Sequence, residues 1–388
     1  MKKLIIPLII ICCACRSATE TESGYVFELA ENGVTITCEG ASPGDTGMVN
    51  GITYTAVDRN LLIYKRNVEE DLSKVCTSPV TNLYGMFSDA DSFNQKIGNW
   101  DVSNVTRMME LFYNAHDFNQ DISNWDVSAV TNMNQMFSNA KSFNQDIASW
   151  DISAVVHMNQ MFAHAESFNQ DIGNWDLSSV THMNHMFSYA DSFNQDIGNW
   201  DVSNVTQMDG LFYNASAFNK NISNWNISNL TSISSIFGGA SAYNQPIGNW
   251  DVSKVIYMTG TFEGAFAFNQ DISDWDVSNV TFMRNMFNKA RSFDQDISGW
   301  NVSSVTNMIE MFFRASSFNQ DIGSWDVSAV TDMYGMFFDA ESFDQDLSDW
   351  CVSNIRREPT NFAERSSLSL VFFPIWGTCP EAVSNEQR

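Results

Sequence analysis

The chain has 388 residues, and its 46 acidic and 20 basic residues give a formal net charge of −26. This excess of negative charge argues against nucleic acid or an anionic membrane surface as the main partner, because a phosphate backbone requires a basic face. Hydrophobic residues make up 44% and aromatic residues 13% of the chain. That content is enough to form a large core and excludes a disordered chain.

The first 15 residues are typical of a bacterial lipoprotein signal peptide. Lys2 and Lys3 precede an apolar run that ends near Cys13, which is too short to span a bilayer, since that takes about 20 apolar residues. Ala14 before Cys15 resembles the cleavage site at which the cysteine becomes lipidated. Ordinary signal cleavage nearby is the alternative. In both cases we expect the protein to leave the cytoplasm, with residues 16–24 as a tether.

A strict 25-residue repeat dominates the rest of the sequence. Eleven of the twelve tryptophans occupy one position of this repeat: Trp100, Trp125, Trp150, Trp175, Trp200, Trp225, Trp250, Trp275, Trp300, Trp325 and Trp350. A fixed period of this length indicates a solenoid in which each unit packs on its neighbours. We therefore expect one elongated array in place of the two or three domains that the length alone suggests.

One unit, residues 172–197, shows which positions face the core. Ile172, Trp175 and Leu177 have the spacing of the strand in a leucine-rich repeat. Apolar residues then recur at steps of 0, 3, 6, 7 and 10 over residues 180–190, which predicts a short amphipathic helix. The expected fold class is an α/β solenoid of about eleven coils, each with a short strand and a short helix.

The turn that closes each unit carries Asn and Gln at matching positions, such as Asn194 and Gln195. A buried polar residue needs a partner, and the same residue one coil along can supply it. We expect these side chains to form structural ladders. The Met and aromatic stripes are likewise assigned to core packing and not to a haem or copper site, because they recur in every unit.

Four cysteines follow the signal segment: Cys38, Cys76, Cys351 and Cys379. An exported protein with an even number of cysteines is expected to form disulfides. Ten coil steps of about 4.8 Å separate the ends of the array by on the order of 50 Å, whereas the Cα atoms of a disulfide lie within about 7 Å. Cys38–Cys76 and Cys351–Cys379 are therefore the expected pairs, each holding a cap over one end of the array.

The segments that flank the repeats are expected to form these caps. Residues 25–75 are predicted to be a β-rich N-terminal cap, because Asn50-Gly51 between two alternating segments is a hairpin signal. The repeat array is expected over residues 76–350. A C-terminal cap and tail should occupy residues 351–388.

The recurring phrase of residues 168–187, FNQDIGNWDLSSVTHMNHMF, resembles the BspA-like leucine-rich-repeat surface proteins of bacteria. The resemblance extends from near Val75 to Val352. It implies a cell-surface protein with adhesion or interaction roles and no general enzymatic activity. One unit in the middle of the array departs from the phrase, with Ile233 and Ile236 in place of two methionines. This departure indicates either a slight bend or only sequence drift.

The column directly after the tryptophans is the main candidate ligand-binding surface. In a leucine-rich-repeat strand this position points to the concave face. Asn226 and Asn301 interrupt a column that is otherwise acidic. Its acidic members are Asp101, Asp126, Asp151, Asp176, Asp201, Asp251, Asp276 and Asp326.

Carboxylates stacked about 5 Å apart repel one another, so some of these aspartates should have raised pKa values, bind cations or find hydrogen-bond donors. Three roles therefore stay open for the column. The aspartates shape turns through hydrogen bonds to Ser or backbone groups, or they form an acidic ligand-binding face, or they hold Ca²⁺.

Two smaller clusters are further candidates. Exposed aromatic residues toward the C-terminal half predict a contact patch. Its members are Tyr257, Phe282, Phe313, Tyr334 and Phe338. His157, His182 and His185 form the one metal-like cluster, since one repeat or a few residues separate them. Incidental surface histidines are the alternative, and no resident metal or cofactor is expected.

No catalytic constellation stands out, so no enzymatic activity is expected. The Ser and Asp residues belong to repeating columns, and the sequence has no phosphate loop, dinucleotide glycine motif or HExxH.

The leading hypothesis is a monomeric lipoprotein of the bacterial outer membrane or cell surface that mediates adhesion or protein–protein interaction through many weak contacts. A glycan-binding surface module, with aromatic rings stacked on sugars, is one alternative, and a structural spacer without a ligand is another. Contact with a membrane is expected through the lipid anchor alone.

Overall fold

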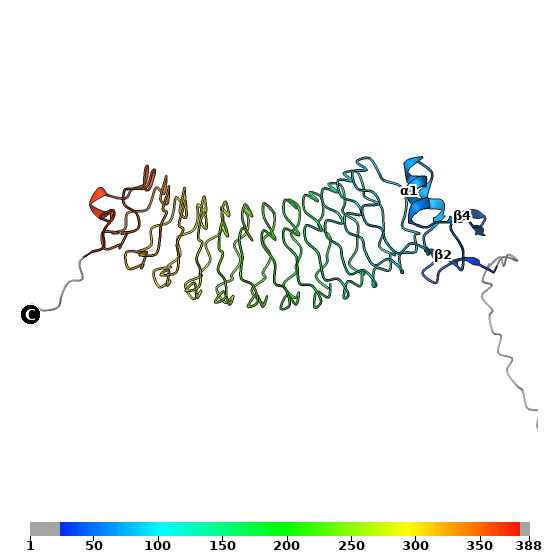
Figure 1. Cartoon of the computed structure of the whole chain (residues 1–388), viewed down its shortest axis with the longest axis horizontal. Helices are drawn as coiled ribbons and strands as arrows, with labels where there is room; N and C mark the ends of the chain where they lie inside the picture. Colours follow the sequence, from blue (N-terminus) through cyan, green and yellow to red (C-terminus); the bar gives the residue numbers. More distant parts are fainter. Residues whose placement is uncertain (1–23, 381–388) are drawn as a thin grey trace, which may run out of the picture.

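The 25-residue units fold into coils that stack side by side, so that residues one repeat apart become neighbours in space (Figure 1). The computed structural model describes residues 24–380, which form one long array with a cap at each end. The expected lipoprotein signal over residues 1–15, with its lipidation site Cys15, lies outside the described residues. The same holds for residues 16–23 of the tether and for residues 381–388.

The N-terminal cap consists of short strands. They are β1 (Val26–Leu29), β2 (Ile36–Glu39), β3 (Thr46–Val49), β4 (Ile52–Ala56) and β5 (Val75–Cys76). β1 pairs with β2 and β3 with β4 in antiparallel register, and β5 joins β4 in parallel. Asn50 and Gly51 have φ values of 50° and 79°, as the two-residue turn between β3 and β4 requires. The predicted hairpin is confirmed.

Helix α1 (Arg59–Asn67) follows β4 and is not predicted by the sequence pattern. Asp58 caps it by accepting a hydrogen bond from the amide of Leu61 at 2.8 Å. The 3-10 helix η1 (Leu72–Lys74) then leads into β5. α1 has nine residues, which is shorter than the window of about 11–18 residues over which an apolar period can be recognised.

The apolar stripe of the repeat forms the core, as predicted. The buried side chains of one coil are Ile172, Trp175, Leu177, Val180, Met183, Met186, Phe187, Ala190 and Phe193. Equivalent rings stack along the array, as Phe162 does on Phe187 with ring centroids 5.8 Å apart. Burying one such side chain contributes about 1.5–3 kcal/mol, so the repetition of this stripe in every coil stabilises the array along its whole length.

Each repeat tryptophan also donates a hydrogen bond to the preceding coil. The indole Nε1 of Trp200 lies 3.0 Å from the carbonyl oxygen of Ile172, and the equivalent bond is present for all eleven repeat tryptophans. Because a buried polar group without a partner is costly, this bond satisfies both the indole and the carbonyl. It explains why Trp and not another large apolar residue occupies the column.

The ladder predicted for the closing turn is confirmed. Asn194 Oδ1 accepts a hydrogen bond from the amide of Asn219 at 3.0 Å, and Gln195 Nε2 donates to Asn169 Oδ1 at 2.9 Å. The links between coils on this side of the array therefore run through side chains.

The prediction of a short helix inside each coil is wrong, because these segments are consecutive turns. Amides alternate between two directions: Met133 and Gln135 donate to carbonyl oxygens of the next coil, whereas Met136 and Ala140 close local four-residue turns. Gln135 and Asn139 have φ values of 55° and 60°, the left-handed conformation that a right-handed helix cannot contain. Apolar residues three apart face inward in such turns just as they would in a helix.

The strand expected around each tryptophan is also misplaced. The parallel β-bridges lie seven residues after the tryptophans, from Asn82 to Gln207 and from Ser232 to Asp332. We call these residues the bridge column. Trp100 makes one parallel bridge to Ile36 of the N-terminal cap. In the other coils, the segments that contain Trp and the residue after it are turns and irregular backbone.

The bridge column is interrupted between Gln207 and Ser232, in the unit whose sequence departs from the repeat. Asp209 Oδ1 there accepts hydrogen bonds from Ser232 Oγ at 2.6 Å and from the amide of Ser234 at 3.1 Å. Side-chain contacts thus link the two coils where the backbone bridge is missing.

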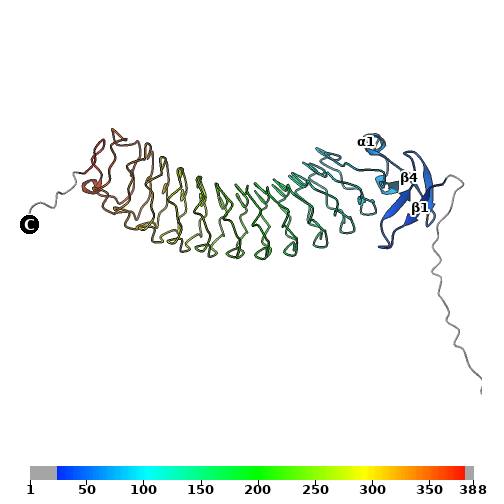
Figure 2. The ribbon, with the colours of Figure 1, turned by 60° about the horizontal axis from the view of Figure 1, so that its bottom comes forward.

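The coils are joined differently on their two sides, and this difference curves the array. On the bridge side backbone amides bond directly to carbonyls, with a spacing of about 4.8 Å, and the ring centroids of Tyr257 and Phe282 are 5.2 Å apart. On the tryptophan side the ring centroids of Trp300 and Trp325 are 6.5 Å apart. The bridge side is therefore the inner, concave side of the curve seen in Figure 2.

The N-terminal edge of the array is covered by α1. The first coil has no preceding coil to donate hydrogen bonds to its carbonyls, and arginines of α1 take over this role. Arg59 donates to the carbonyl oxygens of Asn82 and Tyr84, and Arg66 donates to that of Met86. An edge that would otherwise pair with another chain is thereby closed.

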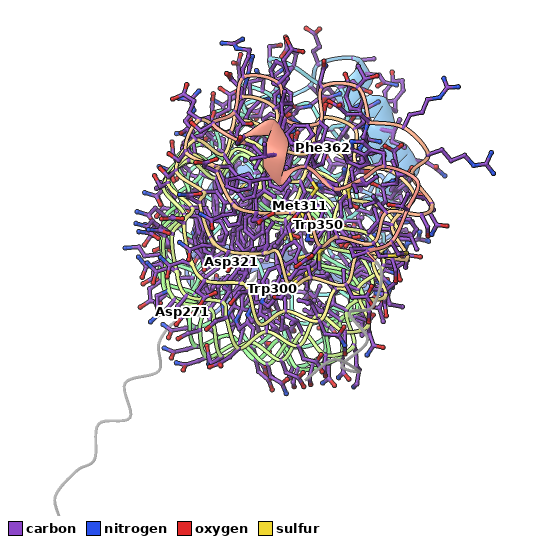
Figure 3. All side chains as sticks on the ribbon, turned by 90° about the vertical axis from the view of Figure 1, so that its left-hand side faces the viewer. Asp271, Trp300, Met311, Asp321, Trp350 and Phe362 are labelled. Carbon is purple, nitrogen blue, oxygen red and sulfur yellow. A yellow bond between two sulfur atoms is a disulfide. The ribbon has the colours of Figure 1, made fainter. Side chains whose placement is uncertain are left out.

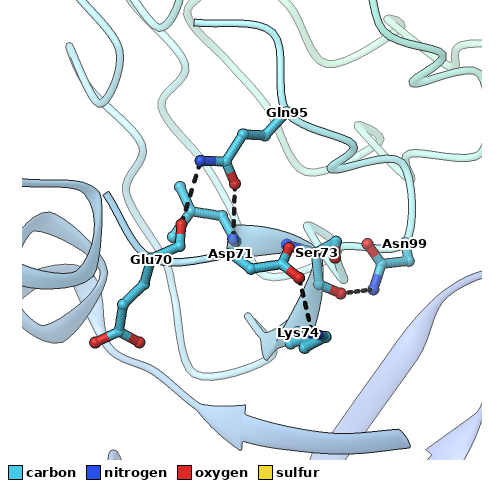
Figure 4. A network of polar contacts seen from close by, with 7 residues as sticks. Glu70, Asp71, Ser73, Lys74, Gln95 and Asn99 are labelled. Atoms are coloured by element: carbon cyan, nitrogen blue, oxygen red, sulfur yellow. Dashed lines mark hydrogen bonds and ion pairs between the residues drawn. The ribbon is translucent and has the colours of Figure 1, made fainter. Parts of the chain in front are cut away.

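A polar network fastens η1 to the first coil, as Figure 4 shows. Gln95 Oε1 accepts from the amide of Leu72 at 2.8 Å, and Gln95 Nε2 donates to the carbonyl of Glu70 at 3.2 Å. Asn99 Nδ2 donates to the carbonyl of Ser73 at 3.0 Å. The side-chain ladder of the array thus continues into the cap.

The C-terminal edge is covered in the complementary way. The last coil offers amides, and Gly335 and Phe337 donate to the carbonyl oxygens of Thr360 and Phe362 at 3.1 and 2.7 Å. The cap also contains the 3-10 helix η2 (Leu370–Phe372).

Both predicted disulfides are confirmed. Cys38–Cys76 joins β2 to β5 with a Cα–Cα distance of 6.2 Å. Cys351–Cys379 ties the C-terminal cap to the end of the array with a Cα–Cα distance of 4.0 Å.

Candidate interaction surfaces

The acidic column after the tryptophans was expected on the concave face, and this placement is wrong. No leucine-rich-repeat strand forms at these residues, and they lie on the tryptophan side of the described array, where the coils are farthest apart. The column is therefore on the outer side of the curve. Its side chains are exposed beyond the first coil, where Asp101 is 8% exposed and accepts a hydrogen bond from Ser78.

Each carboxylate of this column is held by the residue two positions on. Asp251 Oδ1, for example, accepts hydrogen bonds from the hydroxyl of Ser253 at 2.6 Å and from its amide at 3.1 Å. The hydroxyl and then the amide of Ser253 lower the pKa of this carboxyl below its usual value.

The same lowering of the pKa by the following serine occurs at Asp151, Asp176, Asp201, Asp251, Asp276 and Asp326. At Asp176 the charges of Asp151 and Asp201 raise the pKa, but the serine bonds outweigh them. Of the three expected outcomes for stacked carboxylates, these six aspartates show the hydrogen-bond donors, and their pKa values are not raised. The six side chains are therefore ionised at neutral pH.

A second acidic column, in the closing turn, was not singled out from the sequence. Its members are Asp121, Asp146, Asp171, Asp196, Asp271, Asp296, Asp321 and Asp346. Oδ1 of each of these aspartates accepts a hydrogen bond from the backbone amide two residues later, at 2.9 Å for Asp271 and 3.0 Å for Asp321. Viewed along the array, Asp271 lies at the periphery and Trp300 lies inside the coil (Figure 3). The second acidic column could have been found from the sequence by the same pattern as the first, an aspartate that recurs every 25 residues.

Four of the five aromatic residues expected in a contact patch form two stacked pairs. Tyr257 stacks on Phe282 with ring centroids 5.2 Å apart, and Phe313 stacks on Phe338 at 4.9 Å. Tyr257 is 45%, Phe282 36% and Tyr334 40% exposed. Because the paired rings cover one face of each other, much of their exposed surface is ring edge.

The histidine cluster forms only in part. The rings of His157 and His182 meet edge to face with centroids 4.8 Å apart. Within residues 24–380 no three His, Cys, Asp or Glu residues are arranged to hold a metal ion, so the candidate convergence of His185 with this pair is not found. Burial lowers the pKa of His182 and of His185.

A family model described as "Mycoplasma protein of unknown function, DUF285" matches residues 59–175, 160–274, 218–312 and 258–371. Together these overlapping matches span well over half of the chain. The chain belongs to this family. Its four overlapping matches show a repeat protein, in agreement with the stacked coils. The sequence has no match among curated proteins.

The family description gives no cellular location. Among residues 24–380 no helix is long and apolar enough to cross a membrane. The two disulfides are typical of proteins that work outside the reducing cytoplasm.

Proposed function

We propose that the protein is an extracytoplasmic surface protein that binds partner proteins through its acidic columns, in the manner of the BspA-like leucine-rich-repeat proteins that its repeats resemble. The proposal includes a lipid anchor at Cys15 in the outer membrane or cell surface, a monomeric state and no catalytic activity. These parts rest on the sequence.

The observation that supports binding is the fixed geometry of the ionised carboxylates. Where the aspartate is exposed, as at Asp176, its Oδ1 accepts a hydrogen bond from Ser178. The side chain is thereby oriented before any partner arrives, which lowers the entropy cost of binding. One carboxylate per coil, repeated along the array, suits a basic protein surface that makes many weak contacts.

The test is binding of the purified protein to a panel of matrix proteins and glycans, with and without Ca²⁺ and at two salt concentrations. A saturable protein ligand whose binding weakens with salt and with Asp151→Asn, Asp176→Asn and Asp201→Asn supports the proposal. Asn226 accepts the same serine bond, at 2.8 Å from Ser228 Oγ, so these substitutions keep the turn. Loss of binding on Ca²⁺ removal alone would assign the aspartates to a cation site.

A glycan-binding surface module is the second candidate, and the exposed stack of Tyr257 on Phe282 favours it. Binding through these rings would be insensitive to salt and lost in Phe282→Ala and Phe313→Ala. A protein that binds nothing in the panel would instead be a structural spacer.

A further inference from the structure

A hollow of about 350 Å³ lies along the array at the column thirteen residues after the tryptophans. Tyr113 and Tyr213 stand at its two ends, and Ser138, Ala163 and Ser188 lie between them. The three small residues are buried, with exposed fractions of 4–5%, so they form a floor. We call this hollow the tyrosine-ended trough.

The walls of the trough come from two further columns. Gln135, Gln160 and His185 form one wall, and Asn139, His164 and Tyr189 form the other. Their side chains hold one another in place. Gln135 Nε2 donates to Gln160 Oε1 at 2.7 Å, and the ring of His164 stacks on that of Tyr189 with centroids 4.3 Å apart.

All six wall residues adopt the left-handed conformation, with φ between 54° and 60°. Side chains with a Cβ are disfavoured there, at a cost of order 1–3 kcal/mol. Glycine occupies the equivalent positions in other coils, at Gly239 and Gly260. Most other coils also place a non-glycine residue there, such as Asn114, Asn214 and Lys289, so the left-handed conformation belongs to the repeat. What is particular to the trough is that His164 and Tyr189 bring aromatic rings to this column.

His185 is seated by its neighbour in the next coil. A Cβ at Gly210 would lie 2.2 Å from the ring of His185, so the imidazole rests against the Gly210 backbone. The side of the ring with Cε1 and Nδ1 is the one that packs on this glycine.

The lining of the trough contains no Asp, Glu, Lys or Arg, although the protein carries a net charge of −26. Burial lowers the pKa of His164 and of His185, so both imidazoles are neutral at pH 7. Amide, hydroxyl, phenol and neutral imidazole groups donate and accept hydrogen bonds but offer no counter-charge. Lys141, Glu166 and Asp191 affect the pKa of His164, and Asp209 affects that of His185. None of these four residues lines the trough, so a charged ligand would find no ion-pair partner among the lining residues.

Backbone groups are not available to a peptide in this region. The amides of Gln135, Phe137 and Asn139 already donate to carbonyl oxygens of the next coil. An extended peptide therefore cannot add to the array as a strand. What is left for recognition is a row of uncharged polar side chains with tyrosine rings at the ends.

We propose that the tyrosine-ended trough binds a short, uncharged oligosaccharide. Its hydroxyl groups would meet the amides of Gln135 and Gln160 and the imidazole of His185. The C–H faces of its sugars would lie against tyrosine rings, which suit such apolar faces. The site uses neither the acidic columns nor the Tyr257–Phe282 stack, so it stands independently of the proposed protein binding.

The test is saturation-transfer NMR and calorimetry on the purified protein with linear, uncharged tetrasaccharides of glucose, galactose, mannose and N-acetylglucosamine. Sialylated and sulfated oligosaccharides form the charged arm. We expect at least one uncharged tetrasaccharide to bind with little dependence on salt. Binding of none at millimolar concentration, or of charged sugars alone, would overturn the proposal.

Blocking variants locate the site. Ser138→Tyr and Ser188→Tyr fill the trough, and the same column already accommodates Tyr113 and Tyr213, so both variants should fold. They should abolish binding, and Gln160→Ala should weaken it about tenfold, the effect of one lost hydrogen bond. Ser88→Tyr makes the same exchange in the same column outside the trough, so it is the matched control and should bind as the unmodified protein does. Unchanged binding in both blocking variants would refute this location.

Discussion

Arg59 Nη1 in helix α1 lies 3.1 Å from the carbonyl oxygen of Asn82 in the first coil. This bond stands in for the backbone hydrogen bond that a preceding coil would donate, and Arg66 does the same for Met86. A nine-residue helix thus closes one end of a solenoid by presenting guanidinium groups to a row of carbonyls. Such edges, if left open, pair with other chains.

Replacing both arginines, as Arg59→Met and Arg66→Met, should loosen the N-terminal coils first. Each buried or half-buried carbonyl left without a donor costs about 1–3 kcal/mol. Hydrogen exchange should speed up over residues 82–90, ahead of the centre of the array. Lys141→Met is the control, because its exposed ion pair with Glu166 is worth little. If hydrogen exchange in the double variant rose equally along the whole array, the capping role of the two arginines would be contradicted.

The tryptophan hydrogen bond makes a separate prediction. Trp225→Phe keeps an aromatic ring but removes the donor to the carbonyl of Ile197, 3.0 Å away. We expect a loss of about 1–3 kcal/mol in the free energy of unfolding beyond that from the smaller ring. Trp376→Phe in the C-terminal cap, which makes the same exchange outside the repeat column, should cost less in urea unfolding. Equal losses would show that ring size alone matters.

The positions that follow from a strict period are the ones that the sequence predicts well. Every 25 residues Trp, Met, Phe and Ala return to the same column, so their burial is independent of the local conformation. The pairing of Cys38 with Cys76 follows from length alone, since the ends of the array are too far apart for any other arrangement.

The conformation inside each coil is what the apolar pattern does not determine. Steps of three and four fit a helix and also fit consecutive turns. The sequence did contain evidence for turns, because glycine occupies the column of Gln135 and His185 in several coils. These glycines include Gly210, Gly260 and Gly335. Glycine recurring in a supposed helix signals positive φ. The concave face was then misassigned, because its position depends on which side is joined by backbone hydrogen bonds.

Of the candidate sites, the turn-shaping role of the aspartates was within reach of the sequence. Asp-x-Ser spacing, as in Asp251 and Ser253, is the signature of an aspartate that accepts bonds from the residue two positions on. The trough was not. Aligned repeats show small residues between Tyr113 and Tyr213, but only the stacked coils show that they form the floor of a hollow.

The serine bonds of the acidic column predict a dependence of stability on pH. The pKa values of Asp151, Asp176 and Asp201 are lowered below the usual 3.8, so the folded protein holds these carboxylates ionised more strongly than the unfolded chain does. This contribution is fully present above the unfolded pKa and is lost as the pH falls through the folded pKa. The triple variant with Asn at these positions should therefore lose less stability between neutral pH and about pH 3. Thermal melts across this range test it, and parallel pH profiles for variant and unmodified protein would contradict it.

Removing the C-terminal disulfide should expose the other end of the array. The double variant Cys351→Ala and Cys379→Ala frees the cap that accepts hydrogen bonds from Gly335 and Phe337. A disulfide that closes a loop of this size contributes about 3 kcal/mol, so exchange at these two amides should rise while the N-terminal coils stay protected. In a solenoid each coil depends mainly on its neighbours, and fraying should decrease coil by coil away from the cap. Simultaneous loss of protection in the first and last coils would show instead that the array unfolds as one cooperative unit.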